Sequence, residues 1–383
     1  MAERRIPSQL FDGTESFVAV FPNVLPPEEV ARLRRMAEAR GDAGIGLYSD
    51  PATSQSGIDM DEFFVDWPQS LKMRADIGPT SMRHGGRFDL QKRQQKGGQF
   101  RMTLSGYQRE TEEGVTALLQ HEPFHAAARD MLHGERPLID PAVAFGNFMV
   151  PGEIQGVHTD VPEFRGCNRN NVPEWLLVCM HHSGLFERFR IPIITSITWL
   201  SDNEGGALAM YPDPWKPGVA HATPSNSAVI LETDAVWHGV DSVGSRDLAP
   251  PVIPDGSLLR HRGDGRWAVE LPSGEFLEGM DDMSWSDVRF SIQWKAYCWR
   301  DEAERQMAAE HTDDVDGETA FKTLLEEYRT RRGETLEEAS LAAQVSALCV
   351  EFIGDHVPAE LRQVHTEELA AVSAAGAAGH SRL

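Results

Sequence analysis

Short apolar stretches separated by turn residues occupy the middle of the chain. They cover 142–150, 191–200, 207–211, 228–232 and 267–271, with glycine, proline and small polar residues between them. Over 288–298 apolar and polar side chains alternate, which is the pattern of a strand with two different faces. Pro272, Ser273 and Gly274 predict a hairpin turn. Many short strands with turns between them are typical of a sandwich, barrel or jelly roll.

Helical periodicity flanks this strand-rich region on both sides. Before it, the pattern predicts helices over 25–41 and 116–132. After it, one helix face is marked by the apolar residues Phe321, Leu324, Leu325 and Tyr328. A capping box of Thr335 and Glu338 precedes a further apolar stripe over 341–352. The expected fold class is therefore mainly β with flanking helices.

Three regions follow from this pattern. Residues 1–141 are expected to be a helical and loop region that packs on the core, and 142–300 are expected to be the strand-rich core. Residues 301–383 are expected to be a helical extension, with a low-complexity, disordered tail from Ala370. The core contains two insertions, at 161–190 and 245–287. A polar, glycine-rich segment at 81–100 is interpreted as a loop.

The charge balance of the chain argues against two classes of binding partner, nucleic acids and anionic lipids. The 383 residues include 36 Lys and Arg against 59 Asp and Glu, a formal net charge of −23. Such a chain lacks the excess of positive charge that nucleic acids and anionic lipids require, so we expect neither as a partner. The longest apolar stretches are too short to span a bilayer. The four cysteines are scattered, and the first residues lack an apolar leader, which favours a cytoplasmic protein with free thiols.

The segment Val157–Asp160 carries the first candidate chemistry. If it is extended, His158 and Asp160 project from the same face of one strand. An imidazole and a carboxylate so placed can bind adjacent positions of one metal ion. A further histidine would complete a set of two histidines and one carboxylate with open positions, which suits non-haem Fe(II). The alternative is a polar pair on a surface strand, which chance alone makes common.

His238 is the candidate for the further histidine. It lies among Val236, Trp237 and Val240, so it is expected in a buried strand. A buried histidine usually has a hydrogen-bond partner or a function. The alternative is therefore an ordinary core histidine with a satisfied ring.

The alternating strand at 288–298 adds a candidate anion clamp. Arg289 and Ser291 share its polar face, and a guanidinium beside a hydroxyl is suited to binding a carboxylate. The alternative is a solvent-facing edge strand with ordinary polar residues.

These motifs occur in a characteristic order along the chain: His158-Thr159-Asp160, then Trp237-His238-Gly239-Val240, then Arg289-Phe290-Ser291. In that order they resemble the Fe(II)/2-oxoglutarate-dependent oxygenases, in particular the prolyl 4-hydroxylase-like branch. The resemblance covers about 142–299. The segments at 148–152 and 197–211, and the helix that follows Phe21–Leu25, also look like this family.

The resemblance implies a double-stranded β-helix, a jelly roll of the cupin kind. It implies that His158, Asp160 and His238 bind Fe(II). Arg289 would bind the distal carboxylate of the cosubstrate 2-oxoglutarate, and Ser291 would assist. The reaction would use O2 and release succinate and CO2.

Arg246 is a second candidate for that carboxylate. In many members of the family the basic residue follows the last histidine by about ten positions, and Arg246 is nearer to His238 than Arg289 is. We nevertheless favour Arg289, because Arg246 is followed by a loop pattern and has no strand to hold it.

The insertion at 161–190 is interpreted as a loop and short helix that form a lid over the metal. Its arginines Arg165, Arg169 and Arg190 are weak candidates for substrate binding. Trp215, in the strand-rich region, is a further weak candidate, for which a place in the core is the favoured alternative. Pairing of the arginines with neighbouring glutamates at the surface is the favoured alternative. His181 and His182 are further candidates for metal binding or acid–base chemistry. The favoured alternative is that they contact the metal ligands without binding the metal, or lie at the surface.

Taken together, the sequence predicts an enzyme that hydroxylates a small or amino-acid-like molecule. The carboxylate of Asp160 leaves no vacancy for a halide, which favours hydroxylation over halogenation, whereas desaturation or cyclisation would use the same ligands. A cupin-like metal-dependent hydrolase or isomerase, and a non-catalytic jelly roll that binds a metal or a 2-oxo acid, are the alternatives. The C-terminal helices are expected either to form a homodimer interface or to pack on the core.

Overall fold

The computed structural model describes residues 3–9, 14–45, 100–106, 111–168, 171–172, 174–245, 247–248, 251–254, 256–339 and 341–356. Arg169, Arg246, the tail from Ala370 and nearly all of the segment at 81–100 lie outside these described residues. The predictions made for them stay predictions.

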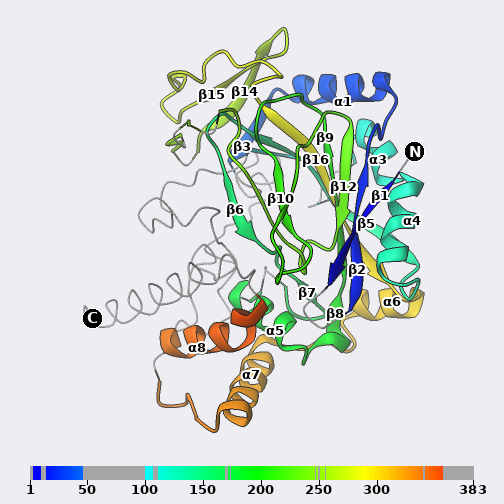
Figure 1. Ribbon diagram of the computed structural model, residues 1–383, viewed down its shortest axis with the longest axis vertical. Helices are drawn as coiled ribbons and strands as arrows, with labels where there is room; N and C mark the ends of the chain where they lie inside the picture. The colour runs from blue at the N-terminus through cyan, green and yellow to red at the C-terminus, as the bar shows by residue number, and fades with distance from the viewer. Residues whose placement is uncertain are drawn as a thin grey trace.

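Eight strands form the centre of the molecule (Figure 1). In chain order they are β5 (Leu138–Met149), β6 (Gln155–His158), β9 (Ile193–Trp199), β10 (Leu208–Tyr211), β11 (Val219–His221), β12 (Ser227–Leu231), β13 (Trp237–Val240) and β16 (Arg289–Trp299). Four of them lie side by side in a larger sheet in the order β12-β9-β16-β5, and four form a smaller sheet in the order β11-β10-β13-β6. All these pairs are antiparallel. Apart from the adjacent pair β10 and β11, chain neighbours among these eight strands alternate between the two sheets as in a jelly roll, which confirms the predicted fold class.

Further strands extend the larger sheet at both edges. On one side lie β2 (Glu15–Phe21) and β1 (Arg4–Gln9), and on the other β4 (Phe100–Ser105), β3 (Asp42–Ile45), β14 (Leu258–Gly263) and β15 (Arg266–Glu270). The N-terminal region therefore supplies strands as well as the predicted helices and loops, because β2 and β4 bury much of their length against the core. The predicted hairpin around Pro272–Gly274 is present as a short one, with an antiparallel bridge from Glu270 to Phe276 and backbone hydrogen bonds of 2.8 Å from Leu271 to Glu275 and from Leu277 to Val269. The longer ladder of β15 is with β14.

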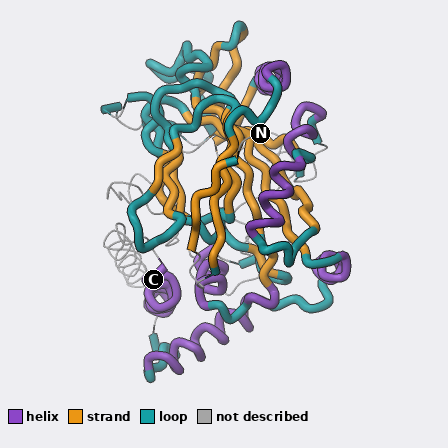
Figure 2. Tube along the Cα trace, turned by 45° about the vertical axis from the view of Figure 1, so that its right-hand side comes forward, coloured by secondary structure: helices purple, strands orange, loops and turns teal. Residues whose placement is uncertain are grey.

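Helices cover the outer face of the larger sheet (Figures 1 and 2). They are α1 (Pro27–Arg40), α3 (Thr116–Leu119) and α4 (Glu122–Met131), with the 3-10 turn η6 (Glu113–Val115) before α3. Phe124 and Met131 of α4 pack with Trp294 of β16 in the main hydrophobic core. The helix predicted over 116–132 is broken, because Pro123 lacks an amide hydrogen and starts a new helix at α4.

The insertion at 161–190 contains the predicted short helix, but that helix is packed in a hydrophobic core, which corrects the prediction that it forms a lid. It contains the two-stranded pair β7 (Glu163–Phe164) and β8 (Arg190–Ile191), the turn η7 (Glu187–Phe189) and α5 (Glu174–Ser183). Residues 175–182 of α5 are all buried. They form a second hydrophobic core with Trp237 and Tyr211 of the smaller sheet and with the C-terminal helices.

The C-terminal helices pack within the chain rather than standing apart from it. They are α6 (Glu302–Glu310), α7 (Gly317–Arg332) and α8 (Leu341–Ile353), followed by the turn η8 (Gly354–His356). Both α7 and α8 contact α5. The predicted capping box is wrong, because α8 begins at Leu341 and Thr335 lies in the loop between α7 and α8.

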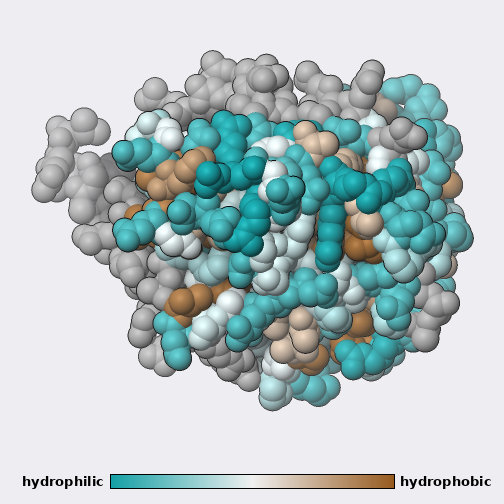
Figure 3. Space-filling model, turned by 90° about the horizontal axis from the view of Figure 1, so that it is seen from above, coloured by the Kyte–Doolittle hydropathy of each residue, from teal (hydrophilic) through white to brown (hydrophobic). Residues whose placement is uncertain are grey.

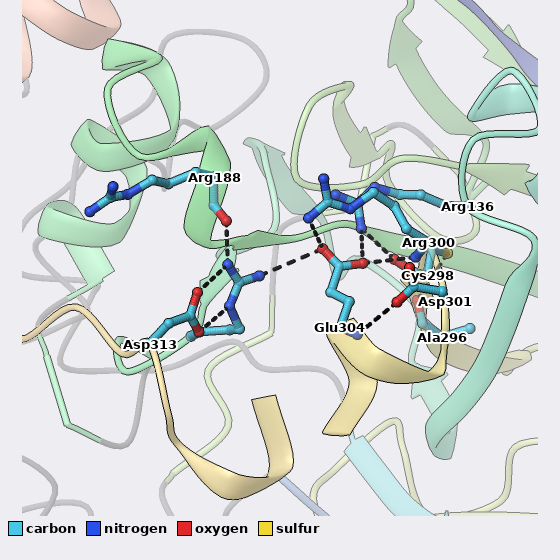
Figure 4. Close-up of polar contacts among 9 residues, drawn as sticks. Arg136, Arg188, Ala296, Cys298, Arg300, Asp301, Glu304 and Asp313 are labelled. Atoms are coloured by element: carbon cyan, nitrogen blue, oxygen red, sulfur yellow. Dashed lines mark hydrogen bonds and ion pairs between the residues drawn. The ribbon is translucent and has the colours of Figure 1, made fainter. Parts of the chain in front are cut away.

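A buried ion cluster ties these regions together (Figure 4). The carboxylate of Glu304, at the start of α6, accepts a hydrogen bond of 2.9 Å from Arg136 and lies 3.0 Å from Arg300 and 3.6 Å from Arg165. Arg165 also binds both carboxylate oxygens of Asp313, at 2.7 and 2.9 Å. These ion pairs join the start of α6 and the segment after it to β16 and to the insertion at 161–190.

The surface carries no broad apolar area in the view of Figure 3, where hydrophobic side chains form separate patches among hydrophilic ones. Trp215 is the most exposed large hydrophobic residue of the described part, at 60%. None of the helices in the described ranges is long and apolar enough to cross a membrane.

Candidate metal centre

His158 and His238 face each other across two paired strands. In the ladder between β6 and β13 they are direct cross-strand partners, and their ring centroids are 4.7 Å apart. Asp160 lies two residues beyond His158, just past the end of β6, so the expectation that both stand on one strand is wrong. The backbone N–H of Asp160 instead donates a 2.7 Å hydrogen bond to the carbonyl of Thr233, which anchors the carboxylate beside the two rings.

The three side chains converge as a metal-ligand set. One ligand atom from each of His158, Asp160 and His238 lies within 4.8 Å of the others, and within the described residues no other such group of histidine, cysteine and acidic side chains is found. Nε2 of His158 is 3.8 Å from Oδ1 of Asp160. Nδ1 of His238 is 2.9 Å from the carbonyl of Val236, which directs Nε2 toward the other two ligands. This donor set fits non-haem Fe(II).

The electrostatics favour the metal-binding protonation states. Burial by itself would raise the pKa of the Asp160 carboxyl, but Lys295 and the two imidazoles outweigh it and hold that pKa well below its usual range. Burial lowers the pKa of His238, against the attraction of Asp160. A carboxylate and a neutral imidazole are the forms that bind a cation.

Lys295 is a neighbour of the site that sequence reasoning missed. Its ammonium contacts Oδ2 of Asp160 and lies 3.4 Å from the hydroxyls of Thr195 and Thr233. The only feature of the sequence that could have indicated this role is the alternation along 288–298, which puts Lys295 on the same face of the strand as Arg289. A lysine on one oxygen leaves the other oxygen of Asp160 to face the histidines.

Arg289 is a buried cation without a carboxylate. It is 1% exposed, its Nε donates to the carbonyl of Gly206 at 2.9 Å, and its guanidinium lies 5.7 Å from the ring of Trp199. Among the described residues no acidic side chain lies within ion-pairing distance of it. Burial lowers its pKa to about 9. The alternative of a solvent-facing edge strand is wrong, because β16 lies between β5 and β9.

Gly206 shapes the place of this arginine. Its φ is +67°, and a Cβ at this position would lie 2.7 Å from Cδ of Arg289. Glycine is thus needed both for the backbone conformation and for the close approach. The Gly205-Gly206 pair is the signal in the sequence for such a backbone conformation.

Ser291 and its cross-strand partner Asn147 are polar side chains inside the jelly roll. Both are 0% exposed. The Ser291 hydroxyl and both polar atoms of the Asn147 carboxamide have no hydrogen-bond partner within the described structure. Such groups are costly unless water or a ligand completes them.

One pocket joins the metal-ligand candidates to Arg289. Its lining includes the three metal-ligand candidates together with Arg289, Lys295, Gln155, Gln293 and Arg101, and apolar side chains such as Phe145, Ile197 and Leu208. The structure therefore brings the predicted ligands and the predicted arginine into one cavity, with polar and apolar walls.

The other predicted residues lie elsewhere. Arg165 belongs to the ion cluster of Figure 4, and Arg190 binds Asp234 at 3.1 Å and Glu232 at 3.3 Å. Neither of them, nor Trp215, lines the pocket. His181 and His182 are buried in the second hydrophobic region, on α5. Arg190 nevertheless supports the site indirectly, because it holds the 232–234 turn whose Thr233 carbonyl anchors Asp160.

Comparison with known proteins returns distant similarities only. No protein-family model and no curated protein matches the chain. Among solved structures, a prolyl-4-hydroxylase from Pseudomonas putida has a TM-score of 0.36 at 12% identity, covering 74% of this chain and 93% of that one. The non-heme alpha ketoglutarate dependent carbocyclase SnoK from nogalamycin biosynthesis has a TM-score of 0.35 at 12% identity, covering 73% and 79%. HygX from Streptomyces hygroscopicus, with nickel, 2-oxoglutarate and hygromycin B bound, has a TM-score of 0.34 at 10% identity, covering 74% and 83%.

Proposed function

We propose that this chain is an Fe(II)- and 2-oxoglutarate-dependent oxygenase that hydroxylates a small molecule. The observation that carries the proposal is the pairing, in one pocket, of a two-histidine, one-carboxylate set with a buried arginine that has no carboxylate. The first group suits Fe(II) with open positions, and the second requires an anion. A cosubstrate with a metal-chelating end and a distant carboxylate satisfies both.

The residues of the chain would divide the work as follows. His158, Asp160 and His238 would hold Fe(II), and Arg289 would bind the distal carboxylate of 2-oxoglutarate with Ser291 as a further donor. When bound, the metal and cosubstrate supply the oxidising chemistry, with conversion of O2 and 2-oxoglutarate to succinate and CO2. The hydrogen bond of His238 to Val236 fixes the orientation of that ring. The contact of Lys295 with Asp160 fixes the carboxylate.

The reaction proposed is hydroxylation because Asp160 occupies the third ligand position. A carboxylate there leaves no place for a halide beside the metal. Desaturation and cyclisation would use the same three ligands, so the product analysis has to separate them from hydroxylation.

The test is an anaerobic titration of the metal-free protein with Fe(II) and then 2-oxoglutarate. We expect a visible charge-transfer band that appears only with both additions and is absent in Asp160→Ala. Folded, metal-loaded wild-type protein without such a band would contradict the proposal. Substrate turnover without O2 would instead point to a metal-dependent hydrolase or isomerase, and binding without succinate release in the presence of its true substrate would point to a sensor.

A further inference from the structure

The two oxygens of the Asp160 carboxylate face different groups. Oδ1 lies 3.8 Å from Nε2 of His158, whereas Oδ2 accepts a hydrogen bond from the ammonium of Lys295. One carboxylate is thus shared between the two histidines of the metal-ligand set and a positively charged side chain. A carboxylate can bind a metal through one oxygen or through both. The lysine therefore bears on how many positions around a metal Asp160 can take.

Lys295 is held in this contact by its strand and by two hydroxyl groups. It lies on β16, between β5 and β9, and its cross-strand partner on β9 is Thr195. Its ammonium is 3.4 Å from the hydroxyls of Thr195 and Thr233, which are buried and lie 2.7 Å from each other. Together with Asp160 they give the ammonium three oxygen neighbours, which match its three N–H donors.

Thr233 fixes both partners of the contact at once. Its carbonyl accepts the backbone N–H of Asp160 at 2.7 Å, and its hydroxyl faces Lys295. The turn around Thr233 is held in turn by Arg190, through ion pairs with the acidic residues on either side of it. The relative position of the ammonium and the carboxylate is therefore set by the fold.

An ordinary ion pair is the alternative, and Lys216 is an example of one. Lys216 pairs with Asp213 at 2.8 Å, three residues away, and its side chain is 75% exposed and outside the described pocket lining. Such a local surface pair contributes little. Lys295 differs because its side chain is 24% exposed, lines the pocket, and contacts one of the metal-ligand candidates.

We propose that Lys295 is a positioning residue that limits Asp160 to one metal-binding oxygen and so keeps a metal position open for the cosubstrate. This inference rests on the proposed function, since it takes Fe(II) and 2-oxoglutarate as the occupants of the pocket. Without the lysine, Oδ2 is free to bind the same ion, and the carboxylate then takes a position that the chelating end of 2-oxoglutarate needs. The ammonium also repels a metal cation, so its loss does not weaken metal binding.

The test measures metal binding and cosubstrate binding separately in Lys295→Met, which keeps most of the side-chain volume without the charge. Calorimetry without oxygen gives the Fe(II) affinity of the metal-free protein and the 2-oxoglutarate affinity of the Fe(II)-loaded protein, and the visible band checks the second value. We expect the 2-oxoglutarate affinity to fall at least about tenfold. Fe(II) should bind as tightly as in the wild type, or up to about tenfold more tightly.

Two further variants complete the test. Lys216→Met removes a lysine that also pairs with an aspartate, but outside the described pocket lining, and it should change neither affinity. Thr195→Val removes one hydroxyl beside the ammonium from a residue that does not line the pocket. It should lower the 2-oxoglutarate affinity about threefold and leave the Fe(II) affinity unchanged. This variant keeps the inference testable if Lys295→Met folds poorly.

Two outcomes would overturn the inference. Equal losses of Fe(II) and 2-oxoglutarate affinity in Lys295→Met, or in Thr195→Val, would mean that the lysine only orients the carboxylate. Wild-type affinity for both in Lys295→Met would mean that the contact has no influence on the site. Failure of the proposed function looks different, because then the visible band is missing from the wild type itself, whereas calorimetry with Fe(II) alone still reports how Lys295 affects the metal.

Discussion

Arg190 in the insertion and Arg289 on β16 are both buried arginines, but their surroundings differ in one respect. Arg190 lies among the carboxylates of Asp234, Glu232 and Glu187, at 3.1, 3.3 and 3.7 Å. Burial alone would lower its pKa, but these carboxylates raise it above the ordinary value. Arg289 has a carbonyl, a thioether and an aromatic ring around it, and its pKa is lowered to about 9. Arg190 is therefore an element of the folded structure, whereas the lack of an acidic partner is the reason why we propose Arg289 as part of a binding site.

The largest expected effect is on stability, from Arg190→Met. Removing this cation leaves buried carboxylates uncompensated, so the free energy of unfolding should fall by about 3–5 kcal/mol in denaturant titration. Adding Glu232→Gln and Asp234→Asn to the same chain should restore part of the loss. A loss below about 1 kcal/mol would remove the distinction between the two arginines.

Arg289→Met should affect ligand binding and leave the stability of the fold intact. The affinity for 2-oxoglutarate should fall about 10- to 100-fold, because a charge-assisted pair is lost. The free energy of unfolding should stay the same or rise, since a buried charge without a partner is removed. The visible band and denaturant titration measure the two quantities on one sample. A stability loss as large as that of Arg190→Met would contradict the comparison.

Gly206→Ala should lower the affinity for 2-oxoglutarate, because the added methyl group displaces Arg289. A Cβ at 2.7 Å from the arginine must displace it, so we expect about a tenfold loss of 2-oxoglutarate affinity, together with about 1–2 kcal/mol of backbone strain. Gly184→Ala is the matched control. Its φ is +70° and nothing lies within 4 Å of the added Cβ, so it should show the strain alone. Equal 2-oxoglutarate affinity in both variants would exclude this positioning role.

The smallest expected effect is a pH dependence from the insertion. Burial lowers the pKa of His181 below its ordinary value of 6.5, with Arg190 acting in the same direction. The unfolded chain therefore binds the proton first as the pH falls. This contribution to stability is complete above about pH 6.5 and is lost as the pH drops below it. His181→Asn should flatten the unfolding free energy between pH values of about 7 and 5, and an unchanged slope would contradict the assignment.

The sequence by itself indicated the three metal-ligand candidates and Arg289, and it determined the class of fold. Alternation along 288–298 put Arg289, Ser291 and Lys295 on one face, and turn residues between apolar stretches marked most strands of the jelly roll. Both signals are local, because the period of a strand and the conformation of a turn depend on adjacent residues. The histidines and the aspartate were recognisable by their spacing and their apolar surroundings.

Only the tertiary structure decided which charged residues are compensated. Arg165, Arg190 and Arg289 look alike along the chain. Arg165 pairs with the acidic residues at positions 304 and 313, and Arg190 pairs with those at positions 232 and 234. Arg289 meets no acidic side chain among the described residues. Arg101, Asn147 and Ser291 likewise become cross-strand neighbours only where β4, β5 and β16 pair. Pairing between distant segments depends on the register of the whole sheet, and no local pattern encodes it.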